Sequence, residues 1–311
     1  MSAPEVIERA ATLLGGRAQR SVPLGPRTTY RVGGPAALFV EIDSEDCLAA
    51  VAAVVAATGI DVLTVGKGSN LLVADAGFPG LALVLGDPFA EIQIQGTTVH
   101  AGAAAALPVV ARRTVAAGLS GFEWAVGVPG SIGGAVRMNA GGHGADLASC
   151  LMGVRVVDLA TGEDGMVPAS ALDLGYRRSA IEPHHLVVSA ELSLERGDPA
   201  QGARTIAEVV AWRRANQPGG PNAGSVFTNP PGDSAGRLID SVGAKGLRVG
   251  TASVSTKHAN FIQADEGGRA DDVRALMDLL VARVADATGI VLHAETRCVG
   301  FPPDPQPEIE G

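Results

Sequence analysis

Residues 126–144 read V-G-V-P-G-S-I-G-G-A-V-R-M-N-A-G-G-H-G, and this stretch decides the fold. Glycine weakens helices and strands and proline removes a backbone donor, so the stretch leaves little room for either element. Glycine also lets main-chain N–H groups gather around an anion with no Cβ in the way. The functional interpretation is a loop that approaches a phosphate-bearing cofactor, and the alternative is a plain glycine-rich turn.

A second loop of similar character favours the functional interpretation. Gly66-Lys67-Gly68-Ser69-Asn70 directly follows an apolar strand candidate at residues 61–65. Because both loops can present backbone amides to an anion, they indicate one long ligand with two phosphates.

Length and charge bound the class of protein. The 311 residues are 46% hydrophobic and 18% charged, enough for a full core and two or three domains. The net charge of −9 argues against nucleic acid or an anionic membrane surface as the main partner, although local basic pockets for phosphates fit.

The cysteines and the N-terminus indicate the compartment. Cys47, Cys150 and Cys298 are widely scattered, with no C-x-x-C and no histidine at zinc-site spacing, so we expect a reducing cytoplasm and no metal. The first ten residues carry charge where a signal peptide is apolar. No uninterrupted apolar run reaches the ~20 residues of a membrane span, so we expect neither secretion nor insertion.

Hydrophobic periodicity and turn residues predict the elements. Predicted helices cover residues 4–14, 44–57, 107–117, 199–216, 235–241 and 271–288. Predicted strands cover residues 37–42, 61–65, 71–74, 81–85, two strands within 90–101, 154–159, 165–167, 186–194, 251–254, 260–264 and 290–299. Residues 21–34 are predicted to be loop-rich.

This order of elements predicts an α+β protein with three regions. Lobe 1 is the α/β segment 1–87, lobe 2 is the mostly antiparallel segment 88–202, and the C-terminal domain is 203–300. The acidic, proline-rich residues 301–311 are predicted to be disordered.

Three common site motifs are missing from the glycine loops. The dinucleotide pattern G-x-G-x-x-G fails because Leu71 stands where its third glycine belongs. The nucleophile elbow G-x-S-x-G fails at Ser131, because Pro129 stands where its first glycine belongs. The phosphate loop that ends in G-K-[ST] fails because Lys67 is followed by glycine. A nicotinamide-dinucleotide domain, a hydrolase and a P-loop kinase are therefore unsupported.

Seven ordered blocks resemble one known family. They are T-T-Y-R-V-G-G-P-A at 28–36, V-G-K-G-S-N-L-L-V at 65–73, V-G-V-P-G-S-I-G-G-A-V-R-M-N-A-G at 126–141, Y-R-R-S at 176–179, A-G-S-V-F-T-N-P at 223–230, K-H-A-N-F at 257–261 and A-E-T-R at 294–297. The chain resembles the UDP-N-acetylenolpyruvoylglucosamine reductases. Residues 260–295 are short, as in the subclass that lacks an added substrate-capping insertion.

The resemblance implies a fold and a reaction. The first two lobes are expected to form the FAD-binding fold shared with vanillyl-alcohol oxidase, and the C-terminal domain to bind substrate. Family enzymes move a hydride from NADPH through non-covalently bound FAD to UDP-N-acetylglucosamine enolpyruvate. The product is UDP-N-acetylmuramate, a cell-wall peptidoglycan precursor. We expect a monomer.

The resemblance also implies site residues. Ser225 matches the general acid, Arg177 the residue that polarises the substrate carboxylate, and Glu295 a third catalytic residue that stabilises charge there. The expected cofactor-binding residues are Arg31, Gly66, Lys67, Gly68, Ser69, Asn70, Gly127, Pro129, Gly130, Ser131, Gly133, Gly134, Asn139 and Gly141. The expected substrate-binding residues are Tyr176, Asn229, His258 and Asn260.

Two positions depart from the family pattern. Asn216 stands where a lysine is frequent, so Arg213 or Arg214 is the candidate to replace that cation toward a diphosphate. His143 stands where tyrosine is frequent.

Two other functions stay open from the residues alone. One is a sugar or alcohol oxidase of the same flavin fold, a class that often holds its flavin covalently through histidine or cysteine. The other is a non-catalytic nucleotide-sugar binding protein.

Overall fold

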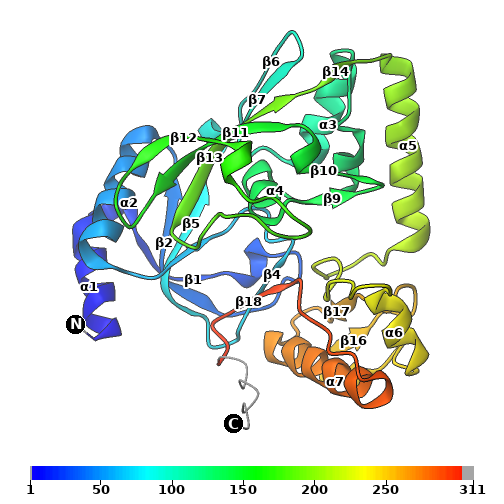
Figure 1. Ribbon diagram of the computed structural model, residues 1–311. Helices are drawn as coiled ribbons and strands as arrows, with labels where there is room; N and C mark the ends of the chain where they lie inside the picture. The colour runs from blue at the N-terminus through cyan, green and yellow to red at the C-terminus, as the bar shows by residue number, and fades with distance from the viewer. Residues whose placement is uncertain (1, 303–311) are drawn as a thin grey trace, which may run out of the picture.

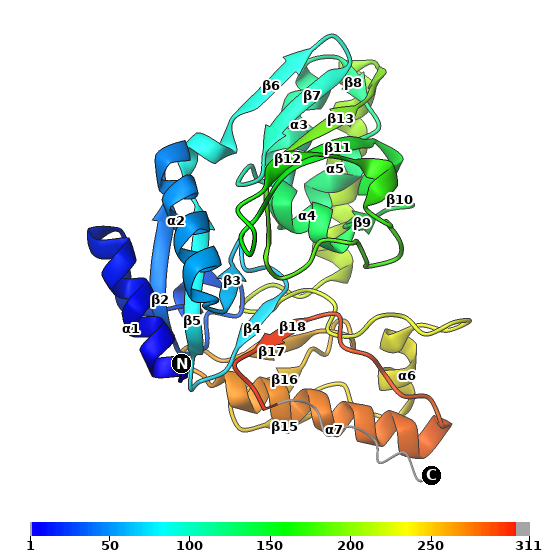
Figure 2. The same ribbon diagram turned by 60° about the vertical axis from the view of Figure 1, so that its left-hand side comes forward.

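The computed structural model describes residues 2–302, so residues 303–311 of the predicted tail lie outside the described residues. Helices and strands are mixed throughout, which confirms the α+β class. Figure 1 shows lobe 1 beside the C-terminal domain with lobe 2 above them, and Figure 2 shows the same arrangement from a second side. Within residues 2–302, no helix has the length and apolar character needed to cross a bilayer.

Lobe 1 is a four-stranded sheet with two helices on one face. The strand order is β1-β2-β5-β3, in which β2, β5 and β3 are parallel and β1 is antiparallel to β2. Its elements are α1 (Ala3–Leu14), β1 (Gln19–Pro23), β2 (Pro35–Ile42), α2 (Glu45–Thr58), β3 (Val62–Thr64), β4 (Leu71–Val73) and β5 (Phe78–Leu85). Leu14 of α1 and Val51 of α2 are buried in one cluster with Leu38 and Leu83 of the sheet.

Local signals set the ends of α2. The Ser44 hydroxyl accepts a hydrogen bond from the Cys47 amide at 3.2 Å, and Gly59 ends the helix at φ 63°. The prediction of a loop across residues 21–34 was wrong at its start, because β1 pairs there with β2. Most β1 side chains are exposed, so the strand carries no hydrophobic alternation to reveal it.

Lobe 2 contains a five-stranded sheet of order β12-β11-β13-β7-β6, and its pairing is antiparallel as predicted. Its elements are β6 (Ile92–Gln95), β7 (Thr98–Gly102), α3 (Leu107–Ala116), β8 (Leu119–Ser120), α4 (Ile132–Met138), β9 (Gly141–Gly142), β10 (Ala145–Asp146), β11 (Leu151–Asp158), β12 (Asp164–Pro168), β13 (His185–Ser193), β14 (Glu195–Arg196) and α5 (Pro199–Asn216). Helix α4 packs on β13 and β7.

Helix α4 corrects the expectation that the long glycine stretch has little room for a helix. Ser131 caps it by accepting a hydrogen bond from the Gly134 amide at 3.4 Å. Ile132 and Val136 are fully buried in the lobe 2 core. Each helical glycine costs about 0.5–1 kcal/mol, while burying one such aliphatic side chain contributes roughly 1.5–3 kcal/mol. Tertiary burial therefore outweighs the local cost.

The C-terminal domain packs a three-stranded sheet on a long helix. Its elements are α6 (Ala235–Ser241), β15 (Arg248–Val249), β16 (Ala252–Val254), β17 (Ile262–Ala264), α7 (Ala270–Thr288) and β18 (Arg297–Val299). The α7 side chains predicted to share one face are all buried; they are Val273, Leu276, Met277, Leu280 and Val284. Residues 260–295 contain β17, α7 and connecting loops and no additional domain.

The last strand returns to lobe 1. The predicted strand over residues 290–299 is wrong in its first part, because only β18 is regular. It pairs in parallel with β4, with Arg297 opposite Leu71. Residues ahead of β18 run instead beside the segment after Ser225. The C-terminal domain is thereby joined to lobe 1 by main-chain hydrogen bonds.

Helix α5 runs unbroken across the boundary expected at residues 202/203. Its buried Val209 belongs to the lobe 2 core, and α5 packs against α3. We propose that lobe 2 extends through α5 and that the C-terminal domain begins after it.

Candidate active site

A cavity of about 610 Å³ lies where lobe 1, lobe 2 and the C-terminal domain meet. This volume is typical of sites for organic ligands. The expected site residues on its wall are Gly66, Lys67, Gly68, Ser69, Asn70, Gly127, Pro129, Gly130, Ser131, Gly134, Gly141, Arg177, Ser225 and Glu295. A second cavity of about 110 Å³ shares part of this wall; the residues common to both are Thr64, Val65, Gly66, Lys67, Ser131, Gly134, Arg137 and Arg297.

Two chain segments bring Ser225 and Glu295 to the same wall. The Val226 carbonyl accepts a hydrogen bond from the Glu295 amide at 2.8 Å, and Phe227 forms a bridge with Ala294. Ser225 directly precedes Val226 in the chain, so this pairing places Ser225 beside Glu295. The serine and the carboxylate therefore face one cavity although they are far apart in sequence.

The first glycine loop holds the Glu295 segment in place. The Asn70 amide group donates to the Glu295 carbonyl oxygen at 3.0 Å, and the Asn70 carbonyl accepts from the Arg297 amide at 3.0 Å. One residue of the loop expected to bind the cofactor thus fixes the backbone that carries the Glu295 carboxylate, which the resemblance implies to be catalytic.

Arg177 reaches the cavity from lobe 2 in a left-handed conformation, with φ 55°. Its Nε lies 2.6 Å from Glu295 Oε1, and its Nη2 donates to the Gly141 carbonyl at 3.3 Å. The Nε–H is not aimed at the carboxylate, so this buried donor has no hydrogen-bond acceptor among the described residues. A non-glycine residue at positive φ is strained, and such residues cluster at functional sites.

Burial governs the ionisation of Glu295, whose side chain is 14% exposed. Burial raises the pKa of this carboxyl, and the neighbouring Arg177 guanidinium opposes part of the rise. Glu295 therefore keeps its proton to a higher pH than an ordinary glutamate does.

The Asn260 side chain clamps the backbone of Phe227 by two hydrogen bonds. It donates to the Phe227 carbonyl at 2.8 Å and accepts from the Phe227 amide at 3.0 Å. Both residues are buried, and Asn260 is not on the cavity wall. The contact that Asn260 makes is with the segment that follows Ser225.

The other expected substrate residues also lie off the wall of the main cavity. Asn229 is exposed and accepts a hydrogen bond from the Ala235 amide at the start of α6. The His258 ring packs on Phe261, with centroids 4.8 Å apart, and burial lowers the pKa of this imidazole. Tyr176 is 62% exposed, and its ring centroid lies 5.4 Å from Arg177 Cζ.

Several glycines of the two loops lie where neighbouring atoms come close to the backbone, or where the backbone has positive φ. A Cβ on Gly66 would lie 2.5 Å from Ser131 Oγ, so the two loops meet closely at a residue without a side chain. Gly68 has φ 60°, a conformation that side chains disfavour. Gly133 lines only the smaller cavity, and its Cβ would point at Ala103, 3.0 Å from that residue's Cβ.

Two expected cofactor residues lie on neither cavity wall. Asn139 is buried and hydrogen-bonded to Asp146 and Gly175 by its amide nitrogen. Its amide oxygen accepts from the Ala148 amide, so the side chain organises the turn after α4. Arg31 is exposed.

Half-buried arginines are the main feature that the sequence analysis left out. Arg137 and Arg297 line both cavities, and Arg213 lines the larger one. Burial lowers the pKa of all three guanidiniums, and Arg137 adds to this at Arg297 by like-charge repulsion. Of the two candidates to replace the missing lysine, Arg213 is on the wall and Arg214 is not. The sequence signal that could have identified one of these arginines is the position of Arg137 inside the glycine-rich stretch 126–144.

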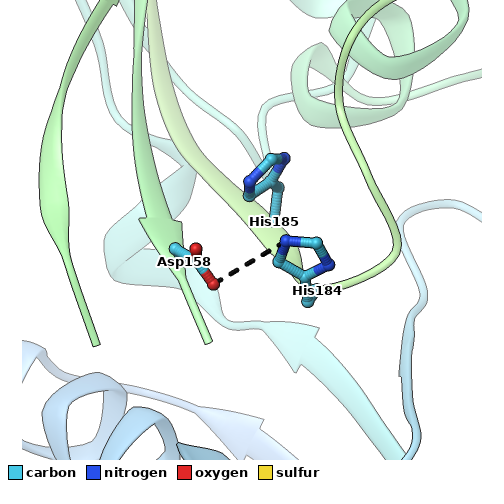
Figure 3. A group of neighbouring side chains, drawn as sticks. All are labelled: Asp158, His184 and His185. Atoms are coloured by element: carbon cyan, nitrogen blue, oxygen red, sulfur yellow. Dashed lines mark ion pairs between the residues drawn. The ribbon is translucent and has the colours of Figure 1, made fainter. Parts of the chain in front are cut away.

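One group of potential metal ligands occurs among residues 2–302, formed by Asp158, His184 and His185 (Figure 3). His185 Nδ1 accepts a hydrogen bond from the Glu182 amide, whereas a metal-bound histidine donates from its second nitrogen. Asp158 Oδ1 is hydrogen-bonded by the Ala160 amide and lies 3.9 Å from His184 Nε2. The donor set does not suit a metal ion, and we assign none.

Comparison with known families defines the class of protein first. Residues 36–163 match a family described as FAD binding domain, a range that covers the larger part of lobe 1 and of lobe 2. Fold and site thus define an FAD-binding oxidoreductase with an additional C-terminal domain. Residues 215–299 match the family described as UDP-N-acetylenolpyruvoylglucosamine reductase, C-terminal domain. The chain belongs to the UDP-N-acetylenolpyruvoylglucosamine reductase family.

Individual relatives match this chain over nearly its full length. The chain is 42% identical over 298 residues to the UDP-N-acetylenolpyruvoylglucosamine reductase of Synechococcus sp. (strain WH7803), covering 92% of this chain and 94% of that protein. It is 42% identical to the Heliobacterium modesticaldum reductase, covering 92% and 91%. The crystal structure of the Thermus caldophilus enzyme matches with a TM-score of 0.80 and 36% identity, covering 91% and 99%. The predicted family and fold are confirmed.

Proposed function

We propose that this protein reduces UDP-N-acetylglucosamine enolpyruvate to UDP-N-acetylmuramate with NADPH, a step in peptidoglycan precursor synthesis. The observation that carries the proposal is the meeting of Arg177, Ser225 and Glu295 at one cavity whose wall is built from two glycine loops. Family membership over most of the chain supports the same reaction.

The cavity fits FAD on the evidence of its own wall. Gly66 allows the two loops to approach within a distance that a Cβ would fill, and the loops line the cavity with backbone. Arg137 and Arg297 supply desolvated positive charge beside them, which suits a pyrophosphate. When bound, FAD carries the hydride between NADPH and the substrate.

Arg177 is proposed to hold the substrate carboxylate. Adding a hydride to the methylene carbon of the enolpyruvyl group leaves negative charge beside that carboxylate. A planar guanidinium fork matches two carboxylate oxygens, and its charge stabilises the negative charge as it develops. Arg177 already pairs with one carboxylate on the cavity wall, that of Glu295, with its Nε 2.6 Å from Glu295 Oε1.

Ser225 is proposed to deliver the proton that completes the reduction. A serine hydroxyl is a weak acid, but it can protonate a strongly basic carbon when held within hydrogen-bond reach. The clamped segment from Val226 to Phe227 fixes the serine backbone for this role.

Glu295 is proposed to share in stabilising the charged site. Burial raises the pKa of Glu295, which favours its neutral form more than in an ordinary glutamate and so reduces repulsion with the substrate carboxylate. Its partner Arg177 is then free to turn toward the substrate.

The test separates the two half-reactions by following flavin absorbance in a stopped-flow instrument without oxygen. NADPH is expected to bleach the bound flavin, and the enolpyruvyl substrate to restore its colour. In Ser225→Ala the bleaching should be near normal and the recolouring slower by ~10²–10⁴-fold, the scale of a general acid. Equal slowing of both steps would indicate a disturbed flavin pocket, and no slowing of either would remove Ser225 from the mechanism.

The two alternative functions give different results in simple assays. A covalent flavin oxidase would keep its colour in the pellet after acid precipitation; the histidines on the cavity walls are His143 on the larger and His185 on the smaller. Non-covalent FAD leaves the colour in solution, the result we expect. A non-catalytic binding protein would be colourless and take up no FAD.

We also propose that the enzyme is a cytoplasmic monomer. One chain supplies both glycine loops and all three proposed catalytic residues, so the site needs no second copy. Cys47, Cys150 and Cys298 are all free thiols, in keeping with a reducing compartment. Size-exclusion chromatography with light scattering tests the monomer directly.

A further inference from the structure

We infer that Trp212 and His143 form a stacking wall for the nucleobase of a nucleotide ligand, an inference that rests on the proposed function and deepens it. Both residues line the main cavity. Neither is among the residues expected to bind the cofactor or the three proposed catalytic residues. Their rings meet edge to face, with centroids 5.0 Å apart and planes at 86°.

Two separate elements hold this pair. His143 lies in the turn between β9 and β10, where it has φ 54° and the following Gly144 has φ 86°. Positive φ at both turn positions is the conformation of a tight two-residue hairpin. Trp212 lies in the last part of α5, and Figure 1 shows the β9–β10 hairpin directed at this helix.

Gly127 allows the hairpin to sit this close to α5. A Cβ at residue 127 would lie 3.0 Å from Val209 Cγ1 and 3.4 Å from His143 Nε2. The contact between hairpin and helix therefore depends on a glycine, and the aromatic pair is built into the fold.

Exposure distinguishes Trp212 from the other tryptophan. Its side chain is 48% exposed, whereas Trp124, the other tryptophan, is 5% exposed in the lobe 2 core. This large apolar surface lies at the wall of the main cavity, where its ring contact is with His143. Every nucleobase offers a flat face that stacks on an aromatic ring.

A cation beside the aromatic pair specifies a nucleotide. Arg213 follows Trp212 directly, lines the same cavity and is anchored by donating to the Gly127 carbonyl at 2.6 Å. A base next to phosphates needs a flat apolar wall next to a positive charge, and residues 212 and 213 offer that combination. The proposed reaction has two such ligands, the uridine diphosphate group of the substrate and NADPH.

Isothermal titration calorimetry on the oxidised, flavin-loaded protein tests the wall with UDP, NADP⁺ and, as a probe without a base, inorganic pyrophosphate. Trp212→Ala is expected to weaken UDP or NADP⁺ binding roughly 5- to 150-fold, the range for loss of one base–aromatic stack. Pyrophosphate affinity should not change, and Trp212→Phe should keep most of the nucleotide affinity. A loss for UDP alone identifies the substrate's base, a loss for NADP⁺ alone identifies the hydride donor's, and a loss for both identifies a shared position.

Controls keep the outcome decisive. Met166→Ala removes an apolar side chain that is 61% exposed and lies on neither cavity wall, so it should leave all three affinities unchanged. The flavin spectrum and thermal midpoint verify that Trp212→Ala is folded. Unchanged UDP and NADP⁺ affinities in Trp212→Ala, or an equal loss of affinity for pyrophosphate, would overturn the nucleobase inference but not the proposed function. Wild-type protein that binds neither nucleotide would overturn the proposed function as well.

Discussion

Replacing Asn260 by alanine should loosen the segment that carries Ser225. The Asn260 side chain accepts a hydrogen bond from the Phe227 amide at 3.0 Å and donates one to the Phe227 carbonyl at 2.8 Å. Asn260 is 3% exposed and Phe227 is 1% exposed. Alanine leaves both backbone groups buried without a partner. Each unsatisfied group costs about 1–3 kcal/mol, so the free energy of unfolding should fall by about 2–6 kcal/mol.

Urea unfolding followed by circular dichroism measures this loss. Asn229→Ala is the matched control, because Asn229 is exposed and accepts one bond, from the Ala235 amide at 3.1 Å. That variant should lose only about 0.5–2 kcal/mol. In Asn260→Ala we expect kcat to fall with little change in KM, since the serine is displaced and no substrate contact is removed. A raised KM with unchanged stability would refute the clamp and return Asn260 to the substrate-binding role expected from the sequence.

Three further predictions address the cofactor loops and the ion pair. Gly66→Ala should weaken flavin binding, because its Cβ would meet Ser131 Oγ, while Gly165→Ala, with nothing within 4 Å of its Cβ and a position on neither cavity wall, should bind flavin normally; flavin absorbance per protein checks both. Arg177→Lys should lower turnover at least ~10²-fold through loss of the planar fork, and near-normal turnover would contradict the carboxylate contact. Because the pKa of Glu295 is raised by burial, the folded protein binds this proton at higher pH than the unfolded chain does. The resulting stability is present at low pH and lost as the pH rises through the folded pKa. Arg177→Gln removes the opposing cation, so the loss should move to higher pH, and pH-dependent unfolding curves that coincide for both proteins would rule this out.

Elements with local signals were predictable from the sequence. Helix α2 has its Ser44 cap and its Gly59 stop, and α7 has an unbroken 3.6-residue period, so short-range chemistry alone defines them. The two glycine loops were predictable as cavity walls for the same reason, because glycine in that density has few uses other than close approach.

Features that depend on distant partners were not predictable in this way. Strand β1 is mostly exposed and exists because β2 satisfies its backbone, and α4 forms because the lobe 2 core buries Ile132 and Val136. At the site, the same limit applies to Asn260. A polar residue in a family block is expected to face the ligand, but its partner Phe227 is 33 residues away and visible only in the fold.

The pairing of β18 with β4 has a consequence for how the protein is made. Leu71 cannot find its partner Arg297 until a further 226 residues have been synthesised, as 297 minus 71. At the usual elongation rate this takes roughly 11–45 s. During that time the loop before β4 lacks the two hydrogen bonds by which Asn70 holds the residues around Glu295. We therefore expect flavin capture to be a late event, completed only when β18 leaves the ribosome and joins the proposed cofactor loop to the segment that carries Glu295.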